Sequence, residues 1–442
     1  MLSISFSPER DALLENCSNT VNVLLRVSAN DLVSSKKKRE ALNLSVVIDR
    51  SGSMSGRPLH EAVRCAGMIL ERLDQNDRLS IVTYDNNVSV NVPSQFVGDR
   101  HVFRNALNDI REGGMTNLHG GWLSGAEQVA LHEDKKAISR VLLLSDGCAN
   151  EGVTDKDEIV RHCATLAESG VQTSTYGLGD GFNELLMAGM AKAGLGNGYY
   201  GQTAEDLMDP FTEEFDLLSS LCAKKIRLTL KPSRGVKVEL FNGYSEDSEG
   251  RFILPDLAYG GEAWAMLSLI VPADMAKSDS GAIHLLTAQI DFTDMENCLQ
   301  SDFAHLRIKP LPVNAFEAIA VDPNVLARVA EVRAAKLQEQ AQTAARRQDW
   351  NRVEEILQEL RKEVAHSPWI AATIAELERY ARRRETDSFS KEAFYSAQKM
   401  RSRLADKNEN ANWSLIEETD KASFLRRKME QGKRFRPDDQ PH

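Results

Sequence analysis

The sequence has no long apolar run and no leader-like N-terminus. Across 442 residues, the longest apolar stretch covers residues 265–271 and stops at Pro272. A membrane helix needs roughly 18 such residues, so we expect no membrane span. No basic segment followed by an apolar one opens the chain, which is unlike a secretory signal. These absences together favour a cytoplasmic protein.

Paired cysteines and an excess of basic residues are also missing. The six cysteines contain no C-x-x-C pair, which indicates neither a zinc site nor a disulfide framework. We therefore expect reduced thiols, most of them buried. The net charge of −11 argues against non-specific nucleic-acid binding, because contacts to phosphates need a basic surface.

Motifs for nucleotide binding and for a nucleophile are incomplete. The segment 177–181, Gly-Leu-Gly-Asp-Gly, follows an expected strand, but Phe182 takes the place of the third glycine of a dinucleotide loop. No phosphate-binding G-x-x-x-x-G-K-[ST] sequence is present. Met54 occupies the centre of Gly52-Ser-Met-Ser-Gly56, where a nucleophile elbow needs serine. We expect a protein that is not an enzyme.

What is present is an ordinary globular composition, 42% hydrophobic and 27% charged, at a length typical of about three domains. Buried strand-like runs alternate with amphipathic helical stretches in the first half of the chain. This alternation predicts a doubly wound α/β domain with a parallel sheet covered on both faces. The expected strands are 44–48, 79–84, 140–144 and 172–176, and the expected helices are 58–73, 102–110, 119–131 and 157–169.

Strand patterns without helices flank this α/β block. Residues 225–230 and 236–240, joined by a turn at 232–235, predict a hairpin, and 263–271 and 284–292 predict further strands. The N-terminal segments 2–6 and 21–27 are expected to join the same antiparallel β-sandwich. The α/β domain would then be inserted into a β-domain.

The last part of the chain is helical in character. Asp322 and Ser367 each precede a proline and are expected to cap helices, and Asp349 is expected to cap a third. Another helical stretch is expected near 391–404. The predicted domains are β-sandwich 1–40 and 205–312, α/β domain 41–204, helical bundle 313–386, and a charged, partly helical, mobile tail 387–442.

Oxygen-bearing side chains gather where expected strands end. Asp49, Ser51 and Ser53 follow the first strand of the α/β block, Thr116 precedes a helix, and Asp146 ends a later strand. Open α/β sheets place their ligands at the carboxyl ends of the strands. Two carboxylates and three hydroxyls suit a hard cation such as Mg²⁺, with Mn²⁺ or Ca²⁺ possible and water completing the shell.

These residues resemble the metal-ion-dependent adhesion site of the von Willebrand factor type A (VWA) domain. The D-x-S-x-S element corresponds to Asp49, Ser51 and Ser53, and the separate threonine and aspartate correspond to Thr116 and Asp146. The resemblance implies a Rossmann-like fold over about 41–204 and a Mg²⁺ ion that captures a Glu or Asp carboxylate of a partner protein. It implies an adaptor, of the intracellular bacterial type, beside an AAA+ ATPase or a kinase or phosphatase. The flanking β-domain is similar to that of inter-α-trypsin-inhibitor heavy chains.

Other readings stay open. The Asp49–Ser53 turn could serve only to cap a helix, or the site could keep its residues without binding metal. A metal-dependent hydrolase or phosphatase would need more carboxylates and histidines than these two carboxylates. An exported adhesin would need an export signal. His119 has no second histidine at zinc-ligand spacing, and we expect it to make local hydrogen bonds at a helix start.

Overall fold

The computed structural model describes residues 2–30, 40–132, 137–178, 182–201, 211–212, 214–218, 220–277, 281–364, 367–402 and 405–406. It divides into two compact units, Lys37–Ser219 and a second that combines Met1–Lys36 with Ser220–His442. The tail beyond residue 406 and the glycines of the 179–181 loop, about which predictions were made above, lie outside the described residues.

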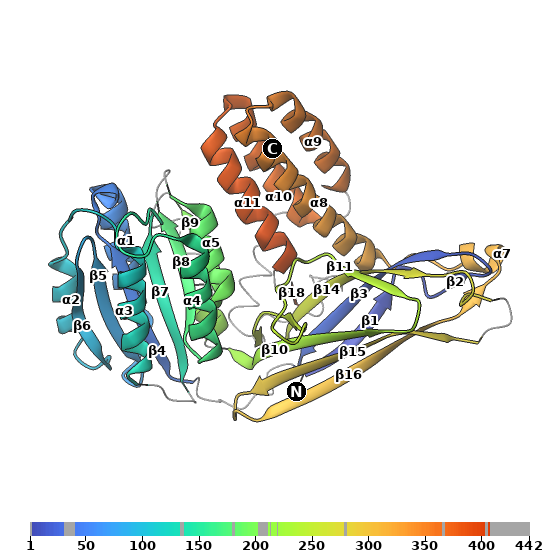
Figure 1. Ribbon diagram of the computed structural model, residues 1–442, viewed down its shortest axis with the longest axis horizontal. Helices are drawn as coiled ribbons and strands as arrows, with labels where there is room; N and C mark the ends of the chain where they lie inside the picture. The colour runs from blue at the N-terminus through green and yellow to red at the C-terminus, as the bar shows by residue number, and fades with distance from the viewer. Residues whose placement is uncertain are drawn as a thin grey trace, which may run out of the picture. The chain divides into compact units, whose positions relative to one another are not determined.

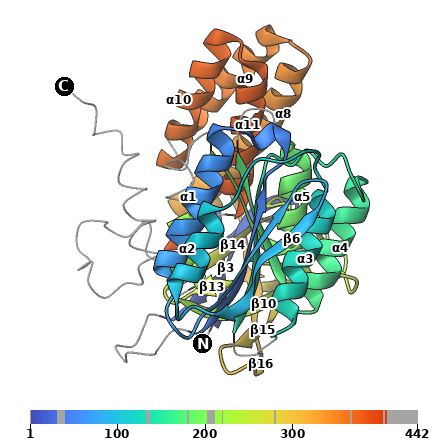
Figure 2. The same cartoon turned by 90° about the vertical axis from the view of Figure 1, so that its left-hand side faces the viewer.

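The Lys37–Ser219 unit contains a six-stranded sheet in the order β6-β5-β4-β7-β8-β9 (Figure 1). All neighbours are parallel except β5 and β6, which pair antiparallel. Helices cover both faces, with α1 and α2 on one side and α3, α4 and α5 on the other (Figure 2). The doubly wound α/β fold is therefore confirmed. The strands are β4 (Leu42–Asp49), β5 (Arg78–Tyr84), β6 (Val88–Phe96), β7 (Ile138–Ser145), β8 (Gln172–Leu178) and β9 (Leu195–Gly201), and the helices are α1 (Arg57–Arg72), α2 (Arg100–Asn108), α3 (Leu118–Ala130), α4 (Lys156–Glu168) and α5 (Glu184–Ala193).

Every residue of β4, β7 and β8 is buried, as expected for strands covered on both faces. Helix α3 lies against the middle of this sheet at two glycines. A Cβ added at Gly121 would lie 2.2 Å from Tyr84 Cδ1, and one at Gly125 would lie 2.3 Å from Val47 Cγ2. The helix backbone can approach the strands only because these positions carry no side chain.

We expect Gly125→Ala to destabilise the protein by about 1–3 kcal/mol, because the added methyl overpacks the contact with Val47. Gly67→Ala in helix α1 is the matched control, since nothing lies within 4 Å of its added Cβ. It should stabilise by about 0.5–1 kcal/mol through helix propensity alone. Urea unfolding of both variants measures the difference, and equal midpoints would show that α3 does not pack as closely as described.

Three elements of this unit were not predicted from the sequence. Strand β6 lies at the sheet edge and contains Pro93, so its apolar alternation is weak. Helix α5 and strand β9 are rich in small residues, and β9 carries Gly196, where an added Cβ would lie 2.1 Å from the backbone oxygen of Thr173. The close approach of β9 to β8 requires glycine at this position. Glycine has no side chain, so β9 lacks the apolar alternation from which a strand is predicted.

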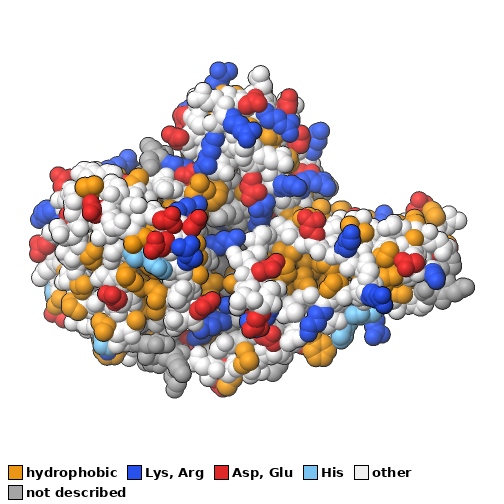
Figure 3. Space-filling model, in the orientation of Figure 1, with side chains coloured by type: hydrophobic (Ala, Val, Ile, Leu, Met, Phe, Trp, Pro, Cys, Tyr) orange, Lys and Arg blue, Asp and Glu red, His pale blue; other side chains and the backbone are white. Residues whose placement is uncertain are grey.

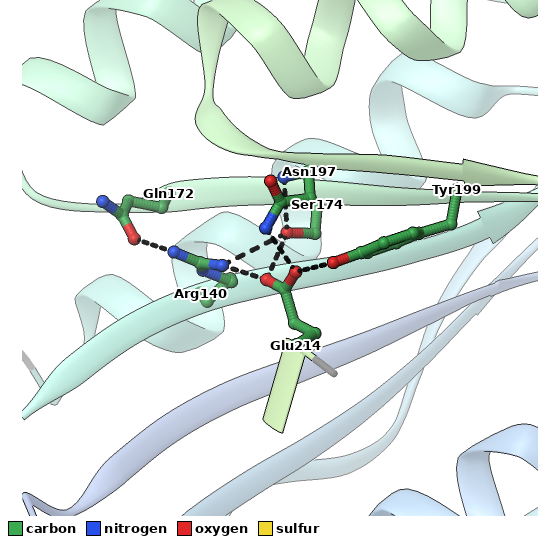
Figure 4. A network of polar contacts seen from close by, with 6 residues as sticks. All are labelled: Arg140, Gln172, Ser174, Asn197, Tyr199 and Glu214. Carbon is green, nitrogen blue, oxygen red and sulfur yellow. Dashed lines mark hydrogen bonds and ion pairs between the residues drawn. The ribbon is translucent and has the colours of Figure 1, made fainter. Parts of the chain in front are cut away.

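A buried polar network lies where β7, β8 and β9 meet the helical segment 214–218 (Figure 4). The Arg140 guanidinium pairs with the Glu214 carboxylate, and both side chains are at most 3% exposed. Ser174 Oγ donates to Glu214 Oε1 at 2.7 Å, while Asn197 Nδ2 and Tyr199 Oη donate to Glu214 Oε2 at 2.6 and 2.7 Å. Arg140 also donates to Gln172 Oε1. The network therefore holds the segment 214–218 against strands β7, β8 and β9.

The second unit contains two antiparallel sheets, β1-β3-β14-β11 with β18 beside β14, and β12-β10-β15-β16 with β13 beside β10. The N-terminal strands β1 and β3 join the strands that follow the inserted unit, so the expected insertion into a β-sandwich is confirmed. The strands are β1 (Leu2–Pro8), β3 (Asn19–Ala29), β10 (Leu221–Pro232), β11 (Lys237–Leu240), β12 (Phe252–Ile253), β13 (Leu257–Ala258), β14 (Gly261–Val271), β15 (Ile283–Asp294), β16 (Leu299–Ile308) and β18 (Ala405–Asp406), and a short parallel pair joins β2 (Leu13–Leu14) to β17 (Pro310–Leu311).

The predicted hairpin between β10 and β11 is wrong. The turn exists, with Val236 N donating to Ser233 O at 3.0 Å and Gly235 at a φ of 91°, but the two strands enter different sheets. Strand β10 pairs with β15 and β11 pairs with β14. A tight turn fixes a change of direction and does not determine which strand becomes the neighbour.

The remaining elements described in the second unit are helices. Asp322 and Asp349 accept hydrogen bonds from the backbone at Asn324 and Arg352, as predicted for caps. Ser367 does not cap, because its hydroxyl donates to Glu331 Oε1 at 2.9 Å instead. The helices are α7 (Val313–Glu317), α8 (Pro323–Arg346), α9 (Trp350–Glu363), α10 (Pro368–Arg383) and α11 (Thr386–Ser402).

Helix α11 corrects the prediction that a mobile tail begins at residue 387. Phe389, Ala393, Ala397 and Met400 are buried in the bundle core with residues of α8, α9 and α10. Their spacing of three and four residues is the helical period. The helical stretch expected near 391–404 overlaps α11, and its burial in the bundle core is what the sequence did not predict.

None of the helices in the described part of the chain combines the length and apolar character that crossing a bilayer requires. Lys and Arg side chains are intermixed with Asp and Glu on the face shown in Figure 3. All six cysteines are free, but only Cys65 and Cys163 are fully buried, so the expectation that most are buried is wrong.

Candidate metal centre

Asp49 is the last residue of β4, at the carboxyl end of the central strands. Its side chain is fully buried. Oδ1 accepts a hydrogen bond from the Ser51 backbone at 2.9 Å, and Oδ2 accepts from Ser145 Oγ at 2.7 Å and Tyr84 Oη at 3.1 Å. These donors hold the carboxylate in one orientation at the edge of the sheet.

Ser51 and Ser53 follow in the short 3₁₀ turn η1 (Gly52–Met54) and the residue before it. Their hydroxyl oxygens lie 3.2 Å apart, with Ser51 buried and Ser53 exposed. The Ser51 hydroxyl makes no capping hydrogen bond to η1. Side-chain capping of η1 therefore does not account for this serine.

Backbone hydrogen bonds join this turn to the loop that carries Thr116. Gly52 N donates to Gly114 O at 2.8 Å, and Gly113 N donates to Arg50 O at 2.7 Å. A Cβ at Gly113 would lie 1.9 Å from Asp85 Oδ2, so only glycine permits this approach. The first and second parts of the predicted site thus lie side by side.

Thr116 and Asp146 lie in the two remaining loops, which are also joined. Thr116 is buried, its backbone N donates to Asn150 Oδ1 at 2.7 Å, and its O accepts from the backbone of Asn150 and Glu151 at 3.1 Å. Asp146 directly follows β7, and its Oδ1 accepts from the Cys148 backbone at 3.0 Å. Hydrogen bonds therefore connect all three predicted parts through their loops.

Two buried carboxylates, Asp49 and Asp146, dominate the electrostatics of the site. Burial raises the pKa of Asp49, and the negative charge of Asp146 adds to this, while the hydrogen bonds from Ser51 and Ser145 act in the opposite direction. A buried carboxylate beside a second one is costly without a cation.

The donor set fits a hard divalent cation. It consists of carboxylate and hydroxyl oxygens, which Mg²⁺ prefers, and it lacks the nitrogen and sulfur ligands that favour zinc. Among the described residues, no three His, Cys, Asp or Glu side chains converge as a metal-binding group. A site with two carboxylates has to complete its shell with hydroxyls and water.

Sequence reasoning missed the residues that support the site. Tyr84 and Ser145 each end a buried strand, and both donate to Asp49. Polar residues at the carboxyl end of an apolar strand were the available signal. Asn150, which holds Thr116, carries no such signal because its position depends on the loop after β7.

The rim of the site combines charge with apolar surface. Arg50 lies between the site residues Asp49 and Ser51 in sequence, and its guanidinium pairs with Asp85 Oδ2 at 2.9 Å. Met115, next to Thr116, is 46% exposed. Both residues are sequence neighbours of predicted site residues.

Comparisons with known proteins find similarity to the von Willebrand factor type A domain. Residues 43–212 match the family model described as the von Willebrand factor type A domain. The YfbK protein of Escherichia coli is 28% identical over 249 residues, which is 52% of this chain and 43% of YfbK. Human inter-alpha-trypsin inhibitor heavy chain H3 is 27% identical over 160 residues, 34% of this chain and 18% of H3. The chain thus spans less than half the length of these relatives.

A solved structure extends the likeness beyond the matched domain. The von Willebrand factor type A protein from Catenulispora acidiphila superposes with a TM-score of 0.64 at 13% sequence identity. The superposition covers 85% of this chain and 89% of that one. At this identity the similarity concerns the fold alone.

Proposed function

Residues 43–212 form a von Willebrand factor type A domain, and we propose that it is a divalent-metal-dependent protein-binding module that captures an acidic side chain of a partner. Asp49, Ser51, Ser53, Thr116 and Asp146 would hold the ion. Mg²⁺ is the proposed ion, and Mn²⁺ or Ca²⁺ could replace it.

The observation that carries the proposal is the buried carboxylate of Asp49. It has no exposed surface, it feels the charge of Asp146, and it is held in place by three hydrogen-bond donors. An arrangement that destabilises the fold in this way is expected where function requires it.

The residues also favour an acidic partner over a neutral one. When bound, Mg²⁺ supplies a coordination position for a carboxylate oxygen of another protein. Two carboxylates and three neutral hydroxyls leave the loaded site without excess negative charge. Arg50 at the rim adds positive charge, although its pairing with Asp85 reduces this contribution.

We further propose a cytoplasmic, non-enzymatic adaptor that works beside an AAA+ ATPase or a kinase or phosphatase. Two carboxylates are too few for the two-ion sites of phosphate hydrolysis. The helical bundle and the sandwich would then serve the assembly rather than a reaction.

Metal binding provides the first test. Calorimetry on metal-stripped full-length protein should show about one Mg²⁺ per chain, and Ser51→Ala/Ser53→Ala should weaken binding by about 10–100-fold. Ser55→Ala is the matched control, because this nearby hydroxyl donates to Glu112 Oε2 at 2.6 Å on the exposed surface. Equal loss in both variants would contradict the site.

Partner capture provides the second test. A protein retained from cell extract by the wild-type chain in Mg²⁺ should be released by EDTA, and the Ser51→Ala/Ser53→Ala chain should not retain it. Substituting the partner's acidic residues in turn should identify one Glu or Asp whose amide form abolishes retention. Retention that is indifferent to both metal and serines would overturn the proposal.

A further inference from the structure

Two histidines that are far apart in sequence contact each other between helices α3 and α4 of the VWA domain. His119 lies in the first turn of α3 and His162 lies in α4. His119 Nε2 and His162 Nδ1 are 2.9 Å apart, and the ring centroids are 5.0 Å apart. The expectation of local hydrogen bonds for His119 is therefore wrong, because its partner comes from another helix.

From this juxtaposition we infer a second metal site, for a borderline transition-metal ion such as Zn²⁺, Co²⁺ or Ni²⁺, with His119 and His162 as its nitrogen ligands. Its nitrogen ligands differ from the donors of the oxygen-rich site, and it does not rest on the proposed function. Imidazole suits these ions, whereas Mg²⁺ prefers oxygen.

The spacing of the two nitrogens is close to what such an ion needs. Two nitrogens at 2.0–2.1 Å from a tetrahedral Zn²⁺ are about 3.3 Å apart. The present separation of 2.9 Å has to widen by only a few tenths of an ångström. At present the two nitrogens share a hydrogen bond, so the donating ring must take its other tautomer and both rings must turn until their lone pairs point at the ion.

The surroundings favour an ion with access to solvent. His119 is 8% exposed and packs against the Trp122 ring at a centroid distance of 5.7 Å, which restrains it. His162 is only half-buried and provides a path of entry. Among the described residues, the second ring nitrogen of each histidine has no recorded hydrogen-bond partner.

A third ligand is available on α4. Glu158 lies four residues before His162, so the two side chains share a face of the helix. Its negative charge is felt at His119, where it opposes the lowering of the pKa caused by burial and by His162. Its carboxylate does not yet complete a three-ligand group in the described structure, so it has to turn towards the pair.

Co²⁺ is the probe of choice, because its visible absorption reports coordination geometry. In saturating Mg²⁺, the full-length chain should bind about one Co²⁺ with a tetrahedral-type spectrum, and Zn²⁺ should displace it. His119→Gln and His162→Gln should each weaken binding by at least about 10-fold, and Glu158→Gln by a smaller factor. His162 is half-buried, so its variant should keep the fold, which circular dichroism checks.

Matched variants separate this site from the others. His101→Gln, which removes a surface histidine of α2, and Ser51→Ala/Ser53→Ala should leave Co²⁺ binding unchanged. Absence of binding, undiminished binding in His162→Gln, or a thiolate-to-cobalt charge-transfer band from a cysteine would each overturn the inference.

Discussion

Replacing Glu214 with alanine should lower the free energy of unfolding by about 3–5 kcal/mol, because it leaves the buried Arg140 guanidinium without its counter-charge. Both side chains are almost fully inaccessible, so bulk solvent does not neutralise the guanidinium that remains. The substitution also leaves the Ser174, Asn197 and Tyr199 donors without their acceptor. Urea unfolding of the full chain, followed by circular dichroism, measures the loss.

An exposed ion pair of the same unit provides the control. Arg104 Nη2 and Glu71 Oε1 are 2.6 Å apart, but the side chains are 45% and 50% exposed. Glu71→Ala should therefore cost no more than about 1 kcal/mol. If both glutamate substitutions cost the same, burial of the Arg140–Glu214 pair does not determine its contribution.

A third variant separates charge from hydrogen bonding. Glu214→Gln keeps an acceptor for Asn197 or Tyr199 but removes the negative charge opposite Arg140. We expect a loss between those of the alanine variant and the wild type. A loss as small as that of Glu71→Ala would show that hydrogen bonds, and not the charge, hold the segment 214–218 to the sheet.

The parallel sheet, and the places of Asp49 and Asp146 at the ends of its strands, could be predicted because they depend on local pattern. Buried strands such as β4 and β7 are continuous apolar runs, and Asp49 and Asp146 stand where those runs stop. In a parallel sheet all such ends lie on one side, so sequence order is enough to bring the loops together. No tertiary contact has to be known in advance.

The remaining parts depend on contacts that sequence spacing does not record. Nothing in the local sequence distinguishes Glu214 from other glutamates, because its partner Arg140 lies on β7. His162 likewise pairs with His119 of another helix, which its own sequence neighbours do not indicate. The pattern near residues 391–404 predicts a helix but not its packing, and Phe389 of α11 lies in the bundle core. In the Arg140–Glu214 and His119–His162 pairs, the two residues lie more than thirty positions apart in sequence.

Asp49→Asn should separate the stability of the VWA domain from its function. We expect Mg²⁺ affinity to fall by more than about 100-fold, because the buried carboxylate is the most constrained of the proposed oxygen donors. Without metal, the free energy of unfolding of Asp49→Asn should exceed that of the wild type by about 0.5–2 kcal/mol. The neutral amide removes a buried charge that lies near Asp146. Calorimetry and thermal unfolding in EDTA measure the two effects.

Added Mg²⁺ should reverse the order of stability. Binding of the ion raises the free energy of unfolding of the wild type, in proportion to the logarithm of the Mg²⁺ concentration relative to the dissociation constant. The free energy of unfolding of Asp49→Asn should rise little. Ser55→Ala should respond to Mg²⁺ as the wild type does. If Asp49→Asn is less stable than the wild type in EDTA, the hydrogen bonds from Ser51, Ser145 and Tyr84 outweigh the cost of the buried charge, and the carboxylate is then a structural element of the strand ends as well as a metal ligand.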